Sequence, residues 1–226
     1  MENILKSHDF EKLYTKRFSE KEREAKAKLW KCLVEKCLQR YFGEYSTIID
    51  LGCGFCEFIN SVKAKKKYGY DKEPYFKAFA GPDVEFIIAE ERRAIPLASA
   101  SCDRVFASNF FEHLDSREHI RFILEEAFRL LKPAGRIIVI QPNIALTGDA
   151  YWDFFDHIVP LSDKSLSEAM ELAGFRKILV KRRFLPYSTK KMKMHSSFLL
   201  RIYLAWPCIQ WVLGKQSLII AEKPDA

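Results

Sequence analysis

The sequence contains too few cysteines for a disulfide scaffold, no apolar leader and no uncharged run long enough to cross a membrane. Its six cysteines in 226 residues lack the density and the pairing pattern of a secreted framework. The first residues, MENILKSHDFEK, are charged where a signal peptide would be apolar. Segment 198–213 has Arg201 as its only charge, but it is shorter than a spanning helix and contains Pro207. We therefore expect a reduced, cytoplasmic protein.

Internal repeats and low-complexity linkers are also absent, and 48% apolar residues are ample for one buried core. A single domain over residues 1–226 is the expectation. The net charge of +7 favours an acidic substrate, a phosphate-bearing ligand or an anionic membrane surface. Because the chain shows no appended nucleic-acid module, no nucleic-acid partner is predicted.

Short β-rich runs alternate with amphipathic segments along most of the chain. Segments 116–132 and 162–173 have helical periodicity, as does the Lys-, Glu- and Ala-rich stretch before Gly43. The β-rich runs are 46–52, 67–71, 84–89, 102–108, 135–141, 175–180 and 215–223. Strands that alternate with helices pair in parallel through right-handed crossovers. The pattern predicts an α/β fold with a Rossmann-like, doubly wound sheet whose ligands bind beyond the carboxyl ends of the strands.

The stretch IIDLGCGFCEF, residues 48–58, has the form of a strand that enters a nucleotide-binding turn. A dinucleotide fingerprint needs a third glycine three positions after the second, but Glu57 stands there. A carboxylate at the start of a helix suits the helix dipole and would repel phosphate. With Asp50 at the mouth of the strand, the turn should prefer a cationic ligand without phosphate. S-adenosylmethionine, with its ammonium and sulfonium groups, fits this requirement.

A second acid, Asp71, ends the run KYGYD about twenty residues further on. A parallel sheet places an acid at this point to accept hydrogen bonds from two ribose hydroxyls. The spacing supports a nucleoside, and the missing phosphate site separates S-adenosylmethionine from NAD.

Four motifs in this order resemble the class I S-adenosylmethionine-dependent methyltransferases. They are DLGCG (50–54), YGYD (68–71), IPLASASCDRVFASNFFEHL (95–114) and LKPAGRIIVIQPN (131–143), within residues 45–145. The resemblance implies a seven-stranded, mostly parallel sheet whose last strand is antiparallel. It also implies a helical cover over residues 1–44, a cofactor-binding core over 45–145 and an acceptor-side region over 146–226. In such a sheet the last two strands form a hairpin, so 198–213 would be an insertion before the last strand.

The resemblance also implies roles for individual residues of the cofactor site. Asp71 would bind the ribose, Glu90 or Glu91 would lie near the adenine amino group, and Asn109 would close the pocket. The methionine part would be lined by Asp50, Gly52, Cys53 and Gly54. One departure is Cys56, where the usual pattern has a third glycine, and a tighter loop is expected there.

A closer likeness is to a bacterial and archaeal subgroup often encoded among cell-surface polysaccharide genes. It extends through LYTKRF and LWKCL and through AYWDFFDHIVPLSDKSLSEAMELAGF followed by RFLPYSTK. This likeness implies transfer of a methyl group to a hydroxyl of a saccharide, a sugar nucleotide or a lipid-linked glycan. The residues expected to contact this acceptor are Tyr14, Arg17, Tyr151 and Trp152. A quinone-like acceptor and a non-catalytic binding protein that retains the fold are the alternatives.

A sugar hydroxyl is a weak nucleophile at neutral pH, so a positioned base would assist its methylation. His157 is the first candidate, with Asp153 or Asp156 as its orienting group, and His113 in NFFEHL is the second. The alternative for both histidines is a structural role in hydrogen bonding, which is the commoner role of a histidine in a loop, and an amine or carboxylate acceptor would need no base.

Several polar and apolar features leave more than one interpretation open. Cys53 and Cys56 form only half of a zinc site, so no metal is predicted. The basic runs 181–184 and 190–195 suit a sugar diphosphate or an ordinary surface. The apolar segment 198–213 suits packing on the protein's own core, peripheral contact with the inner face of a membrane, a homodimer surface or an acceptor lid.

Overall fold

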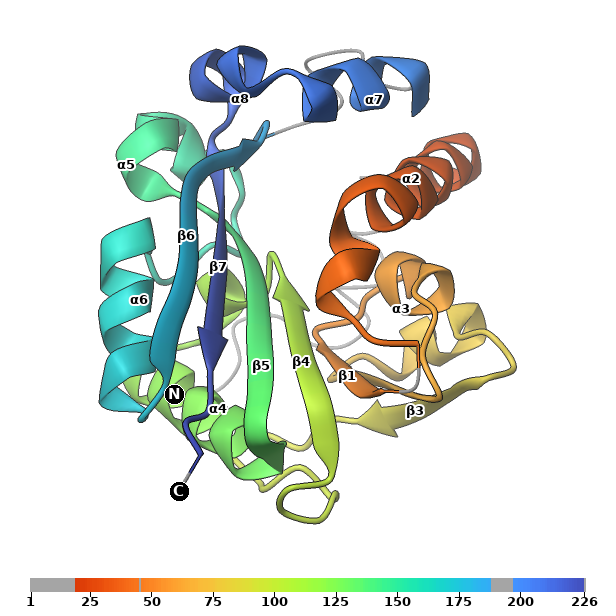
Figure 1. Ribbon diagram of the computed structural model, residues 1–226, viewed down its shortest axis with the longest axis vertical. Coiled ribbons are helices and arrows are strands. Elements are labelled where there is room, and N and C mark those ends of the chain that lie inside the picture. Colours follow the sequence, from red (N-terminus) through yellow and green to blue (C-terminus); the bar gives the residue numbers. More distant parts are fainter. Residues whose placement is uncertain (1–18, 45, 188–196, 226) are drawn as a thin grey trace.

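The computed structural model describes residues 19–44, 46–187 and 197–225. A seven-stranded sheet forms its centre (Figure 1). The strand order is β3-β2-β1-β4-β5-β7-β6. Strands β1 to β5 run parallel, whereas β7 is antiparallel to both β5 and β6. The strands are β1 (Thr47–Leu51), β2 (Lys66–Asp71), β3 (Val84–Ile88), β4 (Cys102–Ser108), β5 (Leu131–Pro142), β6 (Arg176–Leu185) and β7 (Gln216–Glu222). The predicted sheet, including its antiparallel last strand, is confirmed.

Helices cover both faces of this sheet because side chains alternate along each strand. In β1, Ile49 packs in the core beneath α4 (Arg117–Leu130) and α6 (Asp163–Leu172). Its neighbour Ile48 belongs to the opposite core, beneath α2 (Glu20–Leu33) and α3 (Glu57–Ser61). The sheet is therefore the middle layer of three.

The described residues before β1 form a helical cover, as predicted. Ser19 is the N-cap of helix α2 and makes a reciprocal capping box with Glu22. The helix continues through a π-helical turn, η1 (Val34–Leu38), and a 3-10 turn, η2 (Gln39–Tyr41). The remaining short helices are η3 (Pro74–Phe79), η4 (Phe111–His113), α5 (Ile144–Thr147) and η5 (Gly148–Asp153).

The insertion before the last strand is also present, as α7 (Ser197–Ala205) and α8 (Pro207–Leu213). Both lie beyond the carboxyl ends of the parallel strands, and α7 packs against α2 (Figure 1). Leu200 and Tyr203 are buried, so one side of the insertion packs on the protein itself. The other side exposes Phe198, Leu199, Ile202, Trp206, Trp211, Val212 and Leu213. None of the helices that the structure describes combines the length and apolarity of a membrane span.

Candidate active site

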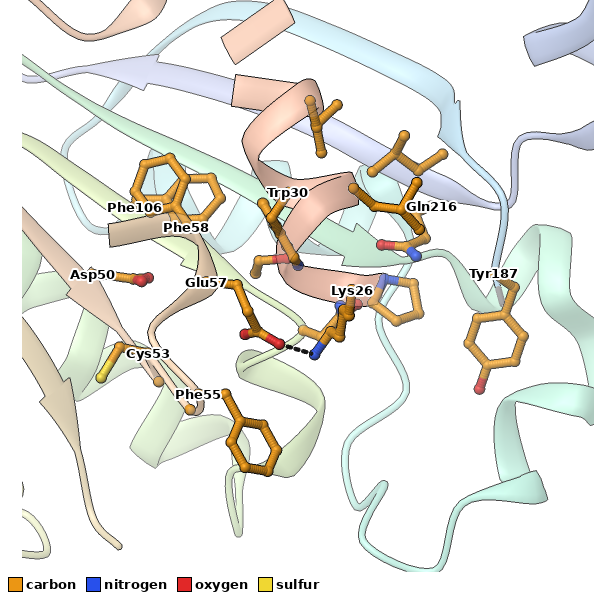
Figure 2. A pocket seen from close by; sticks show the side chains of 18 of the residues that line it. Lys26, Trp30, Asp50, Cys53, Phe55, Glu57, Phe58, Phe106, Tyr187 and Gln216 are labelled. Atoms are coloured by element: carbon orange, nitrogen blue, oxygen red, sulfur yellow. Dashed lines mark ion pairs between the residues drawn. The ribbon is translucent and has the colours of Figure 1, made fainter. Parts of the chain in front are cut away.

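A cavity of about 490 Å³ lies beyond the carboxyl ends of β1 and β4, where the strand order reverses (Figure 2). This is the place at which doubly wound sheets bind their ligands. Its walls come from α2, the turn after β1, the ends of β4 and β5, the loop 154–157, the end of β6 and α7. The turn after β1 belongs to the predicted cofactor motif, whereas most of the other wall segments lie far from it in the sequence.

The turn after β1 depends on backbone geometry that glycine provides. Gly52 has φ of 69°, and a Cβ there would come within 2.4 Å of the Phe110 ring. Gly54 has φ of 49°, and no atom lies within 4 Å of its Cβ position, so its open side is free to receive a ligand. Cys56 also lies in the left-handed region, with φ of 61°, where the family pattern has glycine. A buried cysteine thus adopts the backbone conformation that glycine would supply.

The predicted cofactor acid Asp50 lies in the cavity wall and is only 3% exposed. Burial raises the pKa of Asp50 well above its ordinary range, and Cys56, Asp71 and Glu57 raise this pKa further. A cationic ligand would relieve this accumulation of negative charge. The open side of Gly54 and the buried carboxylate of Asp50 together fit the amino-acid end of S-adenosylmethionine.

Asp71, the predicted ribose acid, is held by the glycine turn. Its Oδ2 accepts a hydrogen bond from Gly54 N at 2.9 Å, and its Oδ1 accepts one from Glu73 N at 3.0 Å. Burial raises the pKa of Asp71, although these two backbone hydrogen bonds oppose the shift. Asp71 therefore fixes the turn, and each of its oxygens retains a lone pair for a ribose hydroxyl.

The other predicted cofactor residues divide into two groups. Asn109 lies in the cavity wall with φ of 49°, and its N–H donates to Ile140 O at 3.0 Å. Glu90 and Glu91 are exposed, and Glu90 pairs with Arg93. Neither glutamate lines the cavity, nor does Asp71. The cavity therefore joins the predicted methionine subsite to the acceptor side, and the predicted ribose and adenine subsites lie outside it.

The two predicted catalytic histidines lie together on the acceptor side of the cavity. The ring centroids of His113 and His157 are 5.0 Å apart with an interplanar angle of 75°. His157 stacks on Phe154 at 5.1 Å. The expected orienting acid, Asp156, contacts the other histidine, because His113 Nδ1 is 2.8 Å from Asp156 O and 3.5 Å from its Oδ2.

The predicted acceptor residues Tyr151 and Trp152 do not line the cavity. Tyr151 is fully buried, its hydroxyl donates to Val159 O at 2.7 Å, and its ring lies 4.8 Å from His157. The Tyr151 ring therefore packs against His157, and direct contact with an acceptor stays a prediction. Trp152 is 52% exposed. Tyr14, Arg17 and the basic run 190–195 fall outside the described residues.

Several wall residues carried no sequence signal for a site. Lys26 on α2 pairs with Glu57 on α3 at 3.1 Å and thereby joins the helical cover to the glycine turn (Figure 2). Trp30, Tyr187 and Gln216 complete the wall from three separate elements. For Lys26 and Trp30, the family resemblance implied only that their helix would cover the fold.

Glu112 was part of a quoted motif, but its role was not assigned from the sequence. Its side chain is fully buried, and burial raises its pKa. Gln141 Nε2 donates to Glu112 Oε2 at 3.0 Å. The carboxylate faces the same part of the cavity as His113 and His157.

Comparison with known proteins agrees with this fold. Residues 49–139 match a family model described as a methyltransferase domain. A methyltransferase from Archaeoglobus fulgidus superposes with a TM-score of 0.64 at 19% identity, covering 87% of this chain and 94% of that one. A possible histamine N-methyltransferase from Thermotoga maritima gives 0.63 at 19% identity, covering 92% and 97%. The cyclase SpnF gives 0.60 at 17% identity, covering 88% and 81%. A search of curated proteins found no match.

At these identities the solved structures establish the fold alone, and the presence of a cyclase among them shows that this fold also hosts other reactions. The family match over the cofactor motif goes further. Together with the site, it supports an S-adenosylmethionine-dependent methyltransferase, so the enzyme and cofactor predictions are confirmed.

Proposed function

We propose that this methyltransferase acts on a hydroxyl group of a saccharide, a sugar nucleotide or a lipid-linked glycan. The observation that carries the proposal is the composition of the acceptor side of the cavity. There the polar residues His113, His157 and Asn109 line the cavity together with Phe154 and Tyr187. Sugars present both hydroxyl groups and apolar ring faces, so a wall that combines hydrogen-bonding groups with aromatic rings suits them.

Separate groups of residues would bind the separate parts of S-adenosylmethionine. Asp50, Gly52, Cys53 and Gly54 would hold the methionine part, with Asp71 at the ribose and Glu90 or Glu91 near the adenine. S-adenosylmethionine, when bound, supplies an electrophilic methyl group on a sulfonium. Helix α2 covers the turn, and this cover would exclude water and align the acceptor, which accounts for much of the acceleration of such a displacement.

The histidine pair would act on the acceptor hydroxyl. His157 is our candidate for the general base, because Phe154 and Tyr151 fix its ring beside the cavity. His113 donates a hydrogen bond to the backbone oxygen of Asp156 and lies next to His157. A base that removes the hydroxyl proton as the C–O bond forms would contribute typically about 10²- to 10⁴-fold.

A second acceptor class is favoured by the apolar part of the cavity wall. Leu29, Leu33 and Leu200 line it together with Phe58 and Phe106. This apolar wall suits a quinone-like or other small apolar acceptor, for which the histidines would act on a phenolic hydroxyl.

Peripheral contact with a membrane would explain the exposed apolar side of the insertion. Trp211 is 74% exposed, and the guanidinium of Arg183 lies 6.0 Å from its ring centroid. Exposed aromatic rings beside basic groups are typical of surfaces that lie in an anionic membrane interface. Such contact would bring the cavity to a lipid-linked glycan, whereas a homodimer surface is the competing explanation of the same side chains.

An acceptor screen tests the proposal directly. Purified enzyme and S-adenosylmethionine are incubated with sugar nucleotides, short lipid-linked saccharides, quinols and small amines, and products are detected as a methyl gain by mass spectrometry. Methylation of a saccharide that depends on Asp71, shown by its loss in Asp71→Ala, is the expected result. Methylation confined to quinols would favour the second class, and methylation confined to amines would overturn both.

A further inference from the structure

The buried carboxylate of Glu112 has one oxygen without a hydrogen-bond partner among the described residues. The side chain is 0% exposed, and Gln141 satisfies only Oε2. No hydrogen-bond donor in the described part of the chain reaches Oε1. A buried carboxylate oxygen without a hydrogen bond is costly, and such groups usually mark a ligand or an ion.

His113 presents a ring nitrogen to this oxygen in a defined tautomer. Its Nδ1 lies 2.8 Å from the backbone oxygen of Asp156, so Nδ1 carries the proton and donates. In the neutral ring the lone pair is then on Nε2, which lies 3.9 Å from Glu112 Oε1. Metal-binding histidines commonly donate their other ring N–H to a backbone carbonyl or a carboxylate in this way.

His157 supplies a third donor in the same place. One donor atom from each of Glu112, His113 and His157 lies within 4.8 Å of the other two. Two donors that each lie about 2.1 Å from one tetrahedral ion are about 3.4 Å apart. The widest separation must therefore close by up to about 1.4 Å, which small rotations of the three side chains can supply.

We propose that Glu112, His113 and His157 form a binding site for one divalent transition-metal cation on the acceptor side of the cavity. Two imidazoles and one carboxylate suit Zn²⁺, Co²⁺, Fe²⁺ or Mn²⁺ better than Mg²⁺, which prefers oxygen ligands. All three residues line the cavity, so the remaining coordination positions face the space that the acceptor would enter. The sequence predicts no metal because only its cysteine pair has a ligand spacing, whereas these three ligands come from two separate segments.

The consequence for the reaction rests on the proposed function. A cation in this position would bind the acceptor hydroxyl and lower its pKa, as bound metal ions do for water. The two histidines would then serve as ligands, and His157 would not be the general base. An acceptor with two adjacent oxygens, such as a vicinal diol, would chelate the ion and be preferred over an isolated hydroxyl.

Cation binding can be measured without any acceptor. Untagged full-length protein is freed of metals with a chelator and titrated with CoCl₂, ZnCl₂ and MgCl₂ by calorimetry, and Co²⁺ binding is also followed by its visible absorption. We expect one Co²⁺ or Zn²⁺ per chain and much weaker binding of Mg²⁺. Replacing a ligand should weaken Co²⁺ binding by about tenfold or more.

Two variants remove ligand atoms with little change of shape. His113→Asn keeps a donor near the position of Nδ1 for the Asp156 carbonyl but removes Nε2, and Glu112→Gln replaces the carboxylate by an amide of equal size. Glu125→Gln, on the exposed side of α4 and paired with Arg121, is the matched control. Far-ultraviolet circular dichroism shows which variants fold, and His113→Asn, at a partly exposed position, provides the test if Glu112→Gln does not.

The outcomes test the cation site independently of the proposed acceptor. Weaker Co²⁺ binding in the ligand variants and unchanged binding in Glu125→Gln would support the site, even if no saccharide is methylated. Absence of saturable binding by the folded wild type, or equal binding by His113→Asn, would overturn it. S-adenosylhomocysteine binding, measured in the same samples, reports separately on the cofactor site.

Discussion

The two sides of the cavity are built in different ways. On the cofactor side, the end of β1 supplies Asp50 and the turn that follows supplies Gly52, Cys53 and Gly54, and backbone N–H groups and positive φ angles define the shape of this turn. On the acceptor side, the wall combines side chains from η4, the loop 154–157, the end of β6 and α7. A local backbone motif therefore forms one side, and long-range packing forms the other.

This difference predicts that substitutions on the two sides separate binding from chemistry. A change in the turn should alter cofactor affinity and folding together, because the turn is part of the sheet. A change on the acceptor side should alter turnover and leave the cofactor in place.

The largest effect is expected for His157→Ala. Whether His157 is a base or a metal ligand, its loss should lower kcat by about 10²-fold or more with the acceptor found in the screen. The affinity for S-adenosylhomocysteine should stay within about twofold, since the predicted cofactor residues come from other elements. Steady-state kinetics and calorimetry measure the two quantities.

His119→Gln is the matched control for this prediction. His119 lies on α4, pairs with Asp115 and does not line the cavity, so its replacement should leave kcat unchanged. Unchanged turnover in folded His157→Ala would exclude both roles of the histidine and favour an acceptor that is already nucleophilic.

The same difference explains how much could be predicted from the sequence. All seven strands and the glycine turn were predicted, because hydrophobic alternation and a G-x-G spacing are local patterns. The proximity of Glu112 to His157 was not predicted, because the two residues are 45 positions apart in the sequence and only the fold brings them together. The burial of Tyr151 against His157 could not be predicted for a similar reason, because sequence patterns place a residue in a loop without indicating which way its ring points.

The next largest effect is expected at Gly52. An alanine Cβ would clash with Phe110 at 2.4 Å and would occupy a left-handed conformation. The two costs, about 1–3 kcal/mol for overpacking and about 1–2 kcal/mol for the backbone, should lower the free energy of unfolding by about 2–5 kcal/mol. Chemical denaturation measures this change.

Gly54→Ala sharpens that measurement, because its Cβ would meet no atom of the protein. We expect only the backbone cost of about 1–2 kcal/mol, together with a clear loss of affinity for S-adenosylhomocysteine as the methyl group fills the open side of the turn. Equal destabilisation by the two substitutions would show that contact with Phe110 contributes little.

A smaller effect is expected for Asp50→Asn. Because burial raises the pKa of Asp50 in the folded chain, the unfolded chain ionises first as pH rises. The carboxylate should therefore lower the stability of the cofactor-free protein between its ordinary pKa and its raised pKa. Asp50→Asn should remove this decline with pH, and it should weaken S-adenosylmethionine binding by about tenfold or more through loss of a charge-assisted hydrogen bond. Denaturation at several pH values and calorimetry test the two statements, and an unchanged affinity would place the ammonium group elsewhere.

The smallest effect is expected for Lys26→Met, which removes the ion pair between the helical cover and the glycine turn. The pair joins a lysine that is 38% exposed to a glutamate that is 9% exposed, so we expect a loss of less than about 1 kcal/mol in the free energy of unfolding. The effect on S-adenosylhomocysteine affinity should be larger than that of Lys28→Met at an exposed position on the same helix. If Lys26→Met and Lys28→Met bind S-adenosylhomocysteine equally well, α2 covers the cavity through apolar packing alone. The helical cover then belongs to the acceptor side of the site and does not connect the two sides.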